Sequence, residues 1–154
     1  AGIATDQFIL EVKPQMIDEL REVMTMNEIM VRSFSTVVAK LHADRAMLDA
    51  ADVNAQRFAN RVKAASKTEM LVQAEHKADQ HHQVVSAASI LAKVRRDASM
   101  RELEEVMHCK IGSGYPHDQD TLNFLSQWVK ENRDLPPCAR HSWKTAQRIK
   151  ASFI

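Results

Sequence analysis

Apolar and polar positions alternate along this chain in two rhythms, which predict two kinds of element. Weak alternation predicts a strand at residues 7–12, and short apolar runs predict strands at 46–48 and 70–74. Apolar residues at helical spacing predict the helices 14–23, 26–41, 55–65, 84–107, one directly after Asp118, and 142–150. Strands that alternate with helices are typical of an α/β domain with parallel strand pairing.

Polar residues mark where several of these helices begin. Thr25, with Glu28 three residues later, forms a capping-box pattern. Asp52 or Asn54 can cap the next helix, and Asp118 precedes a later one in the same way. The long helix at 84–107 is expected to bury an apolar stripe made by Ala87, Leu91, Val94 and Ala98.

Length and composition are those of one ordinary globular domain. The chain has 154 residues, of which 45% are hydrophobic and 27% charged, and no apolar run is long enough to cross a bilayer. The formal net charge is +1, but the distribution is uneven. The C-terminal end is basic, as a phosphate-contacting surface would be, through Lys130, Arg133, Arg140, Lys144, Arg148 and Lys150.

Cys109 and Cys138 are the only cysteines. Without a secretory signal, they indicate free thiols in a reducing, cytoplasmic setting. A zinc site that includes Cys138 and His141 is conceivable, but adjacent His108 and Cys109 are poorly spaced as ligands. The chain begins with Ala rather than Met, so we expect processing or a longer parent protein.

Asp49 and Asp79 are the first candidates for chemistry. Each lies at or just beyond the C-terminal end of a predicted strand, where ligands and catalytic groups gather in α/β sheets. Two such carboxylates could hold a hard divalent cation such as Mg²⁺ or Mn²⁺, and two metals can promote phosphodiester cleavage. Position alone favours the simpler interpretation that both are turn or capping residues.

Six segments together narrow the choice. In order along the chain they are residues 49–53 (DAADV), 76–79 (HKAD), 84–94 (VVSAASILAKV), 96–97 (RD), 111–116 (IGSGYP) and 142–145 (SWKT). Their order and spacing resemble the archaeal type of ribonuclease HII, most strongly from about residue 46 to 148. Residues 24–28 (MTMNE) resemble a helix-opening segment of the same family.

The resemblance implies a ribonuclease H-like α/β fold, a mixed sheet flanked by helices. Residues 1–110 would form the catalytic core, and residues 111–154 a helical, substrate-binding part of the same domain. The implied activity is a two-metal endoribonuclease that cleaves the RNA strand of RNA–DNA hybrids and cuts 5′ to single ribonucleotides in duplex DNA.

The resemblance also assigns roles to individual residues. Asp49 and Asp79 match two of the family's four active-site carboxylates, which bind Mg²⁺ or Mn²⁺. Tyr115 matches the tyrosine that packs on the sugar beside the RNA–DNA junction. Lys77 and Lys93 lie in matching motifs and are assigned to phosphate contact or to orienting the carboxylates.

The sequence departs from the family in one serious respect. The family's first strand carries an Asp-Glu-Ala-Gly-Arg-Gly motif, which supplies the other two carboxylates and a backbone that reads the ribose 2′-hydroxyl, and this chain has no such motif. The central strands of the family's sheet would also be absent from this chain, leaving its own strands short of neighbours. The alternative reading is therefore a catalytically incomplete remnant or fragment that only binds duplexes. A smaller departure is His81-His82, where the family usually has an aromatic-Pro pair.

The C-terminus partly resembles a motif by which archaeal members dock on the sliding clamp. Gln147, Phe153 and Ile154 fall at motif positions, but Lys150 occupies the place of an aliphatic anchor. The resemblance implies at most a weak clamp contact. The alternative is that Ile149 and Phe153, at i,i+4 spacing, pack on the domain itself.

Overall fold

The computed structural model describes residues 4–154, which divide into two compact units. The first unit contains the described residues up to Glu11 together with Val23–Ala92, and the second contains Val12–Glu22 and Lys93–Ile154. None of the helices in residues 4–154 is long and apolar enough to cross a membrane.

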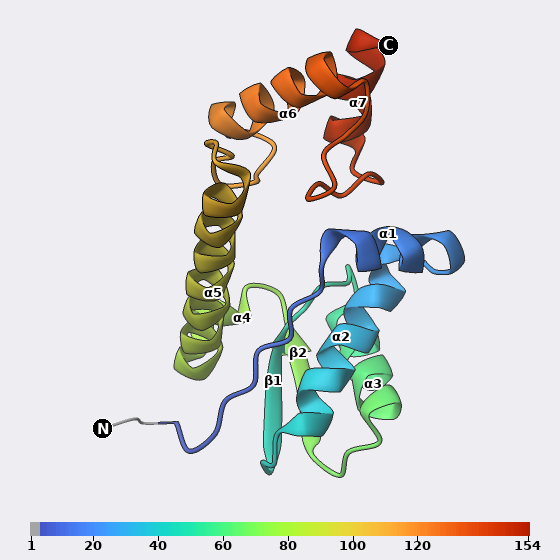
Figure 1. Ribbon diagram of the computed structural model, residues 1–154. Coiled ribbons are helices and arrows are strands. Elements are labelled where there is room, and N and C mark those ends of the chain that lie inside the picture. Colours follow the sequence, from blue (N-terminus) through green and yellow to red (C-terminus); the bar gives the residue numbers. More distant parts are fainter. Residues whose placement is uncertain (1–3) are drawn as a thin grey trace. The chain divides into compact units, whose positions relative to one another are not determined.

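The first unit is built around a two-stranded parallel sheet (Figure 1). Strand β1 (Arg45–Asp49) pairs with β2 (Leu71–Glu75) in a register that places Asp49 opposite Glu75. Helix α3 (Ala55–Ser66) connects the two strands, and α2 (Met26–Lys40) packs against α3. Both strands and both helices lie where the apolar pattern predicts them. The α/β class with parallel pairing is therefore confirmed.

The core of this unit lies where α2, α3 and the sheet meet. Phe58 and Val62 of α3 are fully buried, and the Phe58 ring meets that of Phe34 edge to face, with centroids 5.1 Å apart. Their buried neighbours in the cluster are Val31, Val38, Leu48, Ala59, Met70 and Val72. This packing fixes the end of β1 on a rigid scaffold.

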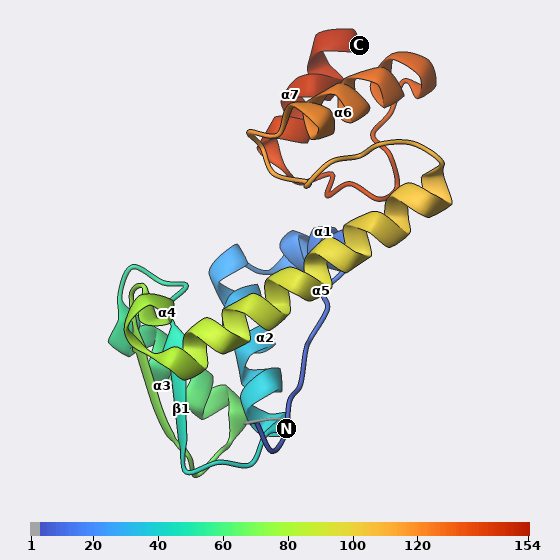
Figure 2. The same ribbon diagram turned by 90° about the vertical axis from the view of Figure 1, so that its left-hand side faces the viewer.

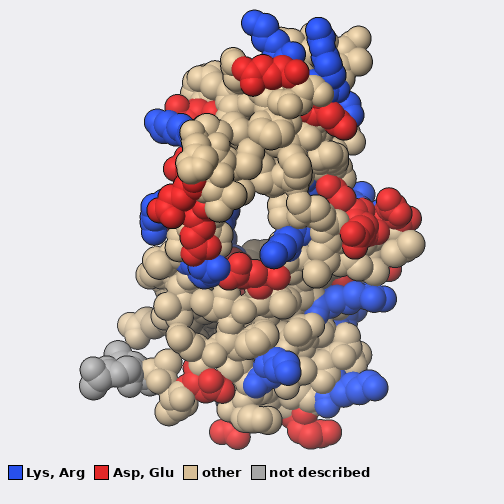
Figure 3. All heavy atoms as spheres, viewed as in Figure 1, with Lys and Arg blue, Asp and Glu red and all other residues tan. Residues whose placement is uncertain are grey.

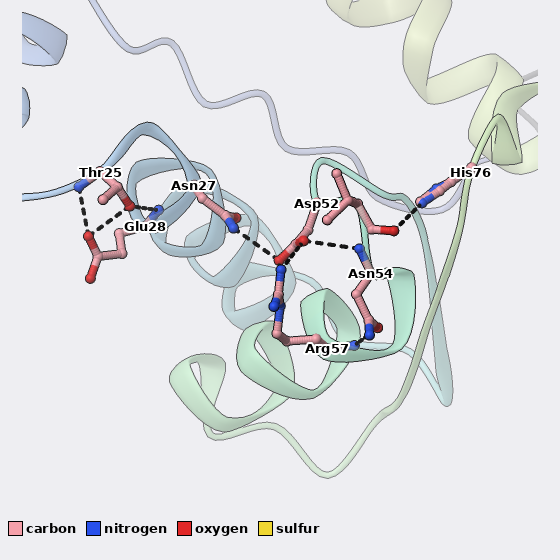
Figure 4. Close-up of polar contacts among 8 residues, drawn as sticks. Thr25, Asn27, Glu28, Asp52, Asn54, Arg57 and His76 are labelled. Atoms are coloured by element: carbon pink, nitrogen blue, oxygen red, sulfur yellow. Dashed lines mark hydrogen bonds and ion pairs between the residues drawn. The ribbon is translucent and has the colours of Figure 1, made fainter.

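Helix α2 begins with the predicted capping box (Figure 4). The Thr25 hydroxyl oxygen accepts a hydrogen bond from the Glu28 backbone N–H at 3.2 Å, and Glu28 Oε2 accepts one from the Thr25 N–H at 2.7 Å. Of the two candidates for the N-cap of α3, the structure selects Asn54, whose side chain accepts a hydrogen bond from Arg57 N at 2.9 Å.

The other candidate, Asp52, is a buried junction between α2 and α3 (Figure 4). Its carboxylate accepts hydrogen bonds from Arg57 Nη2 at 2.5 Å and Nε at 2.9 Å, from Asn27 Nδ2 at 2.9 Å and from Asn54 N at 3.0 Å. The hydrogen bonds from Arg57, and then those from Asn27 and Asn54, hold the pKa of Asp52 far below its usual range. Asp52 is thus a structural anion.

Two expectations for this part of the chain were wrong. Residues 7–12 are not a strand, because no neighbouring strand among residues 4–154 is available to complete a ladder with them. Short helix α4 (Ala78–His81) leads into α5 (Gln83–Met107), which runs uninterrupted (Figure 2), but its predicted inner stripe is largely exposed. Ala87, Leu91 and Val94 are exposed and Ala98 is half-buried, whereas Val85 is buried.

The second unit is helical and has a smaller apolar centre. Helices α1 (Pro14–Val23), α6 (Gln119–Asn132) and α7 (Lys144–Phe153) belong to it, apart from Val23, as does α5 from Lys93 onward. Its buried cluster consists of Val129 in α6, Leu135 between α6 and α7, and Ala146 in α7, with Trp143 and Ile149 packed against them. Asp18 of α1 accepts hydrogen bonds from the backbone of His141 and Ser142 at 2.6 and 2.9 Å. A carboxylate therefore fixes the start of α7.

Candidate active site

Asp49 is the last residue of β1, and its exposed carboxylate faces the turn that follows β2. Its Oδ1 accepts a hydrogen bond from the backbone N–H of buried Ala78 at 3.3 Å. The ladder continues beside it, since Ala50 N donates to the Glu75 carbonyl oxygen at 2.9 Å. These contacts bring the end of β1 to the residue that directly precedes Asp79.

Asp79 lies in the first turn of α4 and is half-buried. Its carboxylate has no hydrogen-bond or ion-pair partner within residues 4–154. Exposed Lys77, the N-cap residue of α4, adopts the left-handed conformation with φ of 58°. A non-glycine residue in this region is strained, and such strain often accompanies functional turns.

Glu75, opposite Asp49 in the register of the sheet, is a carboxylate that sequence reasoning missed. Its Oε1 accepts hydrogen bonds from His81 Nδ1 at 3.0 Å and from His82 Nε2 at 2.9 Å. The hydrogen bond from His81, reinforced by His82, holds the pKa of Glu75 below its usual range. The sequence carried a signal for this cluster, namely the two histidines at positions where the resembled family has other residues.

A hard divalent cation fits the donor chemistry of Asp49 and Asp79, because both offer carboxylate oxygen and Asp79 has no competing partner. The fit is partial. Within residues 4–154 no three His, Cys, Asp or Glu side chains are grouped so that they could hold a metal. Cys109 and Cys138 are both free thiols, and burial raises the pKa of Cys138.

In the second unit, the loop of residues 111–116 is held on one side by Glu104 of α5. Glu104 Oε1 accepts hydrogen bonds from Ile111 N at 2.7 Å and from Gly112 N at 2.8 Å. These two bonds, with the bond from Gly112 contributing most, lower the pKa of Glu104. No sequence signal indicated this role, because Glu104 is one of many charged residues along α5.

Asp118 and Thr121 hold the loop on its other side. Asp118 Oδ2 accepts hydrogen bonds from Ser113 N at 2.5 Å and Ser113 Oγ at 2.6 Å, and these bonds lower its pKa to about 2. Thr121 Oγ1 accepts one from Gly114 N at 2.9 Å. Gly112 has φ of +82°, and a Cβ there would lie 2.6 Å from Asp118 Oδ2, so glycine is required.

The loop presents Tyr115 to solvent. The side chain is 52% exposed, and one face of its ring lies 4.0 Å from the guanidinium carbon of Arg96. Lys93, also in the second unit, is exposed on α5. The structure thus brings Asp49 together with the turn of Lys77 and Asp79, whereas Tyr115 and Lys93 belong to the other unit.

The basic C-terminal end is partly neutralised. Lys150 Nζ pairs with Asp134 at 2.6 Å, and Figure 3 shows both signs of charge side by side over the C-terminal helices. Arg133 Nη1 donates to the Phe153 carbonyl oxygen at 3.0 Å. The exposed cations of this region are Lys130, Arg133, Lys144 and Arg148.

The amino-acid sequence of this chain is similar to those of known proteins. A model of the family described as Ribonuclease HII matches residues 4–146. Ribonuclease HII of Methanothrix thermoacetophila is 58% identical over 153 residues, which are 99% of this chain and 72% of that protein. Ribonuclease HII of Pyrococcus horikoshii is 40% identical, over 98% of this chain and 68% of that protein.

Solved structures agree. The crystal structure of ribonuclease H2 from Pyrococcus horikoshii matches with a TM-score of 0.84 and 39% identity, over 95% of this chain and 69% of that one. The ribonuclease HII of Archaeoglobus fulgidus, solved in complex with PCNA, matches with a TM-score of 0.82 and 34% identity, over 91% of this chain and 66% of that one. The chain therefore belongs to the ribonuclease HII family.

Proposed function

We propose that the natural protein containing this chain is a divalent-metal-dependent endoribonuclease. Its substrates are RNA–DNA hybrids, cut in the RNA strand, and DNA duplexes with a single embedded ribonucleotide, cut on its 5′ side. The observation that carries the proposal is the corner at the end of β1. There, in a ribonuclease HII family member, the Asp49 carboxylate is hydrogen-bonded to the turn that bears the partnerless Asp79.

Asp49 and Asp79 would hold the metal, Mg²⁺ or Mn²⁺, by oxygen ligands. Bound metal supplies activation of a water and neutralisation of charge on the leaving oxygen. The protein's own contribution is orientation. The Ala78 N–H fixes one Asp49 oxygen, and the strained Lys77 turn places Asp79 at the start of α4. Two carboxylates are few for two metals, so the proposal includes further ligands from residues beyond this chain.

Each unit carries residues suited to substrate binding. Lys77 and Lys93 are exposed cations suited to phosphate contact, and the exposed cations of α6, α7 and the segment between them extend that capacity. Phosphate contacts position a duplex without reading it. Tyr115 offers a half-exposed ring for packing on a sugar, which is the contact that would distinguish a ribonucleotide junction.

A second candidate function is duplex binding without cleavage. The observation that favours it is the lack, within residues 4–154, of any three-ligand group for a metal. Under this reading the basic residues and Tyr115 bind nucleic acid, while Asp49 and Asp79 are a turn and a helix-start residue.

The experiment is a cleavage assay on a DNA duplex with one ribonucleotide, using the natural protein with Mg²⁺ or Mn²⁺. We expect a cut 5′ to the ribonucleotide, leaving 3′-hydroxyl and 5′-phosphate ends, and loss of cleavage in Asp49→Asn. The control is Asp44→Asn, an exposed aspartate before the opposite end of β1, which should cleave normally. Tight binding without cleavage under every metal would establish the second function instead.

The same assay on the isolated 154-residue chain tests whether its own carboxylates are enough to bind the metal and support cleavage. We expect little or no cleavage, because affinity for hard cations rises with the number of carboxylates. Efficient cleavage by this chain, abolished by Asp49→Asn, would mean that its own carboxylates suffice.

We further propose a weak sliding-clamp contact through the C-terminus, since the Archaeoglobus fulgidus relative was solved with PCNA. Ile149 packs on the core of the second unit, but Phe153 and Ile154 are 37% and 71% exposed. Of the apolar motif positions only Phe153 and Ile154 are therefore offered to a partner, beside exposed Gln147 and without an aliphatic anchor. Calorimetry of a peptide spanning residues 147–154 with the cognate clamp tests this, and no heat at high micromolar concentration would leave only the packing role.

A further inference from the structure

Arg96 makes two contacts with the loop that bears Tyr115, and the site described above does not use them. Its Nη2 donates a hydrogen bond to the Ser113 carbonyl oxygen at 2.6 Å. Its guanidinium carbon also lies 4.0 Å from the centroid of the Tyr115 ring, which is cation–π distance. Both contacts lie within the second unit.

The other side chains that hold the loop make no polar contact with the Tyr115 ring. Glu104, Asp118 and Thr121 bind backbone groups and the Ser113 hydroxyl, at residues 111–114. Within residues 4–154, the other polar contacts of Tyr115 are made by its backbone, whose N–H lies 3.5 Å from Ser113 Oγ and whose carbonyl accepts from Asp118 N at 3.1 Å. Within residues 4–154, Arg96 alone touches the ring in a polar or cation–π contact.

Gly114 makes this approach geometrically feasible. Its φ is +75°, and a Cβ at this position would lie 3.1 Å from Arg96 Nη2 and 3.4 Å from the Met100 methyl group. A side chain at residue 114 would therefore crowd the guanidinium as well as strain the backbone. The glycine leaves the space in which Arg96 reaches past the loop to the ring.

We propose that Arg96 is a positioning residue that sets the orientation of the Tyr115 ring for sugar recognition. The proposal rests on the proposed function. The planar guanidinium is held by the Ser113 carbonyl and covers one face of the ring, which leaves the other face for the substrate. Ordering the ring before binding removes part of the entropy cost that a free aromatic side chain would incur on contact.

The adjacent arginine provides a matched control. Arg95 Nη1 pairs with Glu102 Oε1 on the same helix at 2.9 Å, and its side chain is exposed to a degree similar to that of Arg96, at 36% against 35%. The two residues share charge, helix and exposure, but only Arg96 contacts the loop.

The experiment compares Arg96→Gln, Arg96→Lys, Arg95→Gln, Tyr115→Ala and the double variant Arg96→Gln/Tyr115→Ala in the natural protein. The readouts are KM and kcat on the single-ribonucleotide duplex, and affinity in metal-free buffer for that duplex against an all-DNA duplex. We expect Arg96→Gln to reduce discrimination between the duplexes about two- to fivefold, through KM rather than kcat. Arg96→Lys should restore part of it, and Arg95→Gln should stay within about twofold of wild type.

The double variant separates positioning from a general structural role. If Arg96 acts through Tyr115, the double variant should discriminate no worse than Tyr115→Ala alone. Losses that multiply in the double variant, equal losses on both duplexes, or an Arg96→Gln protein that matches Arg95→Gln would each overturn the proposal while leaving the nuclease function intact. A wild-type protein that neither cleaves nor discriminates would overturn the proposed function, and the role of Arg96 with it.

Discussion

The two units hold their functional residues in place by different means. In the first, Asp49 is the last residue of a strand anchored in an apolar cluster around fully buried Phe58 and Val62. In the second, the loop that carries Tyr115 is held by hydrogen bonds to Glu104 and Asp118, and the unit's apolar cluster is small.

The difference teaches what each kind of support can do. Apolar packing is non-directional and insensitive to pH, so it suits a scaffold on which carboxylates must hold fixed positions. Hydrogen bonds to carboxylates orient individual backbone amides, which suits a loop with two glycines at positive φ. Such a loop is defined by charge and should loosen when the charge is removed.

The largest effect is expected at the corner of the first unit. In the natural protein, Asp79→Asn should reduce single-turnover cleavage about 10³-fold, because metal coordination contributes several kcal/mol to the transition state and each 1.36 kcal/mol is tenfold. Circular dichroism should be unchanged, since the carboxylate has no partner within residues 4–154. Cleavage within tenfold of wild type would remove Asp79 from the ligand set.

The next effect is on stability and tests the contrast in packing. Phe58→Ala should lower the free energy of unfolding of the first unit by about 3–5 kcal/mol, because it leaves a cavity beside Phe34. Amide hydrogen exchange, read separately for the two units, measures this. A smaller destabilisation than that of Leu135→Ala in the second unit would contradict this difference in packing between the units.

The sequence was most informative where structure depends on neighbours along the chain. The capping box of Thr25 and Glu28, strands β1 and β2 and the bounds of α5 follow from signals within a few residues. The position of Asp49 beside the Asp79 turn was inferred from strand ends, and the hydrogen bond to Ala78 N supports it. Tyr115 was found through its Gly-Ser-Gly loop and the family resemblance.

The sequence was least informative where structure depends on distant segments. The alternation at residues 7–12 predicts a strand, but a strand needs a partner, and within residues 4–154 none pairs there. The apolar residues of α5 do recur at helical spacing, yet Leu91 and Val94 are 43% and 58% exposed. Periodicity shows which face of a helix is apolar, but not whether another segment packs against that face. Arg96 contacts the loop at a residue 17 positions later in the chain, and Glu104 at one 7 positions later. No local sequence pattern predicts either contact.

A smaller effect is expected for the tyrosine. Tyr115→Ala should lower the preference for a ribonucleotide-containing duplex over an all-DNA duplex by about tenfold, comparable with other aromatic contacts to nucleotides. Affinity for the all-DNA duplex and the salt dependence of binding should change little, because those come from Lys and Arg contacts to phosphate. Binding measured at two salt concentrations separates the two, and equal losses for both duplexes would assign Tyr115 to structure.

The smallest and most local effect is expected at low pH, where protonation of Asp118 should weaken its hydrogen bonds to the loop that carries Tyr115. Hydrogen bonds from the Ser113 hydroxyl and N–H lower the pKa of Asp118 from 3.8 to about 2, so its stabilisation of the loop is complete above pH 3.8 and is lost as pH falls through 2. The amide proton resonance of Ser113 should therefore titrate with a midpoint near pH 2. In Asp118→Asn this titration should vanish, whereas Glu105→Gln, which removes an exposed carboxylate of α5 outside the loop, should leave it intact. A Ser113 midpoint near the ordinary aspartate value of 3.8 would mean that the loop does not rest on this carboxylate.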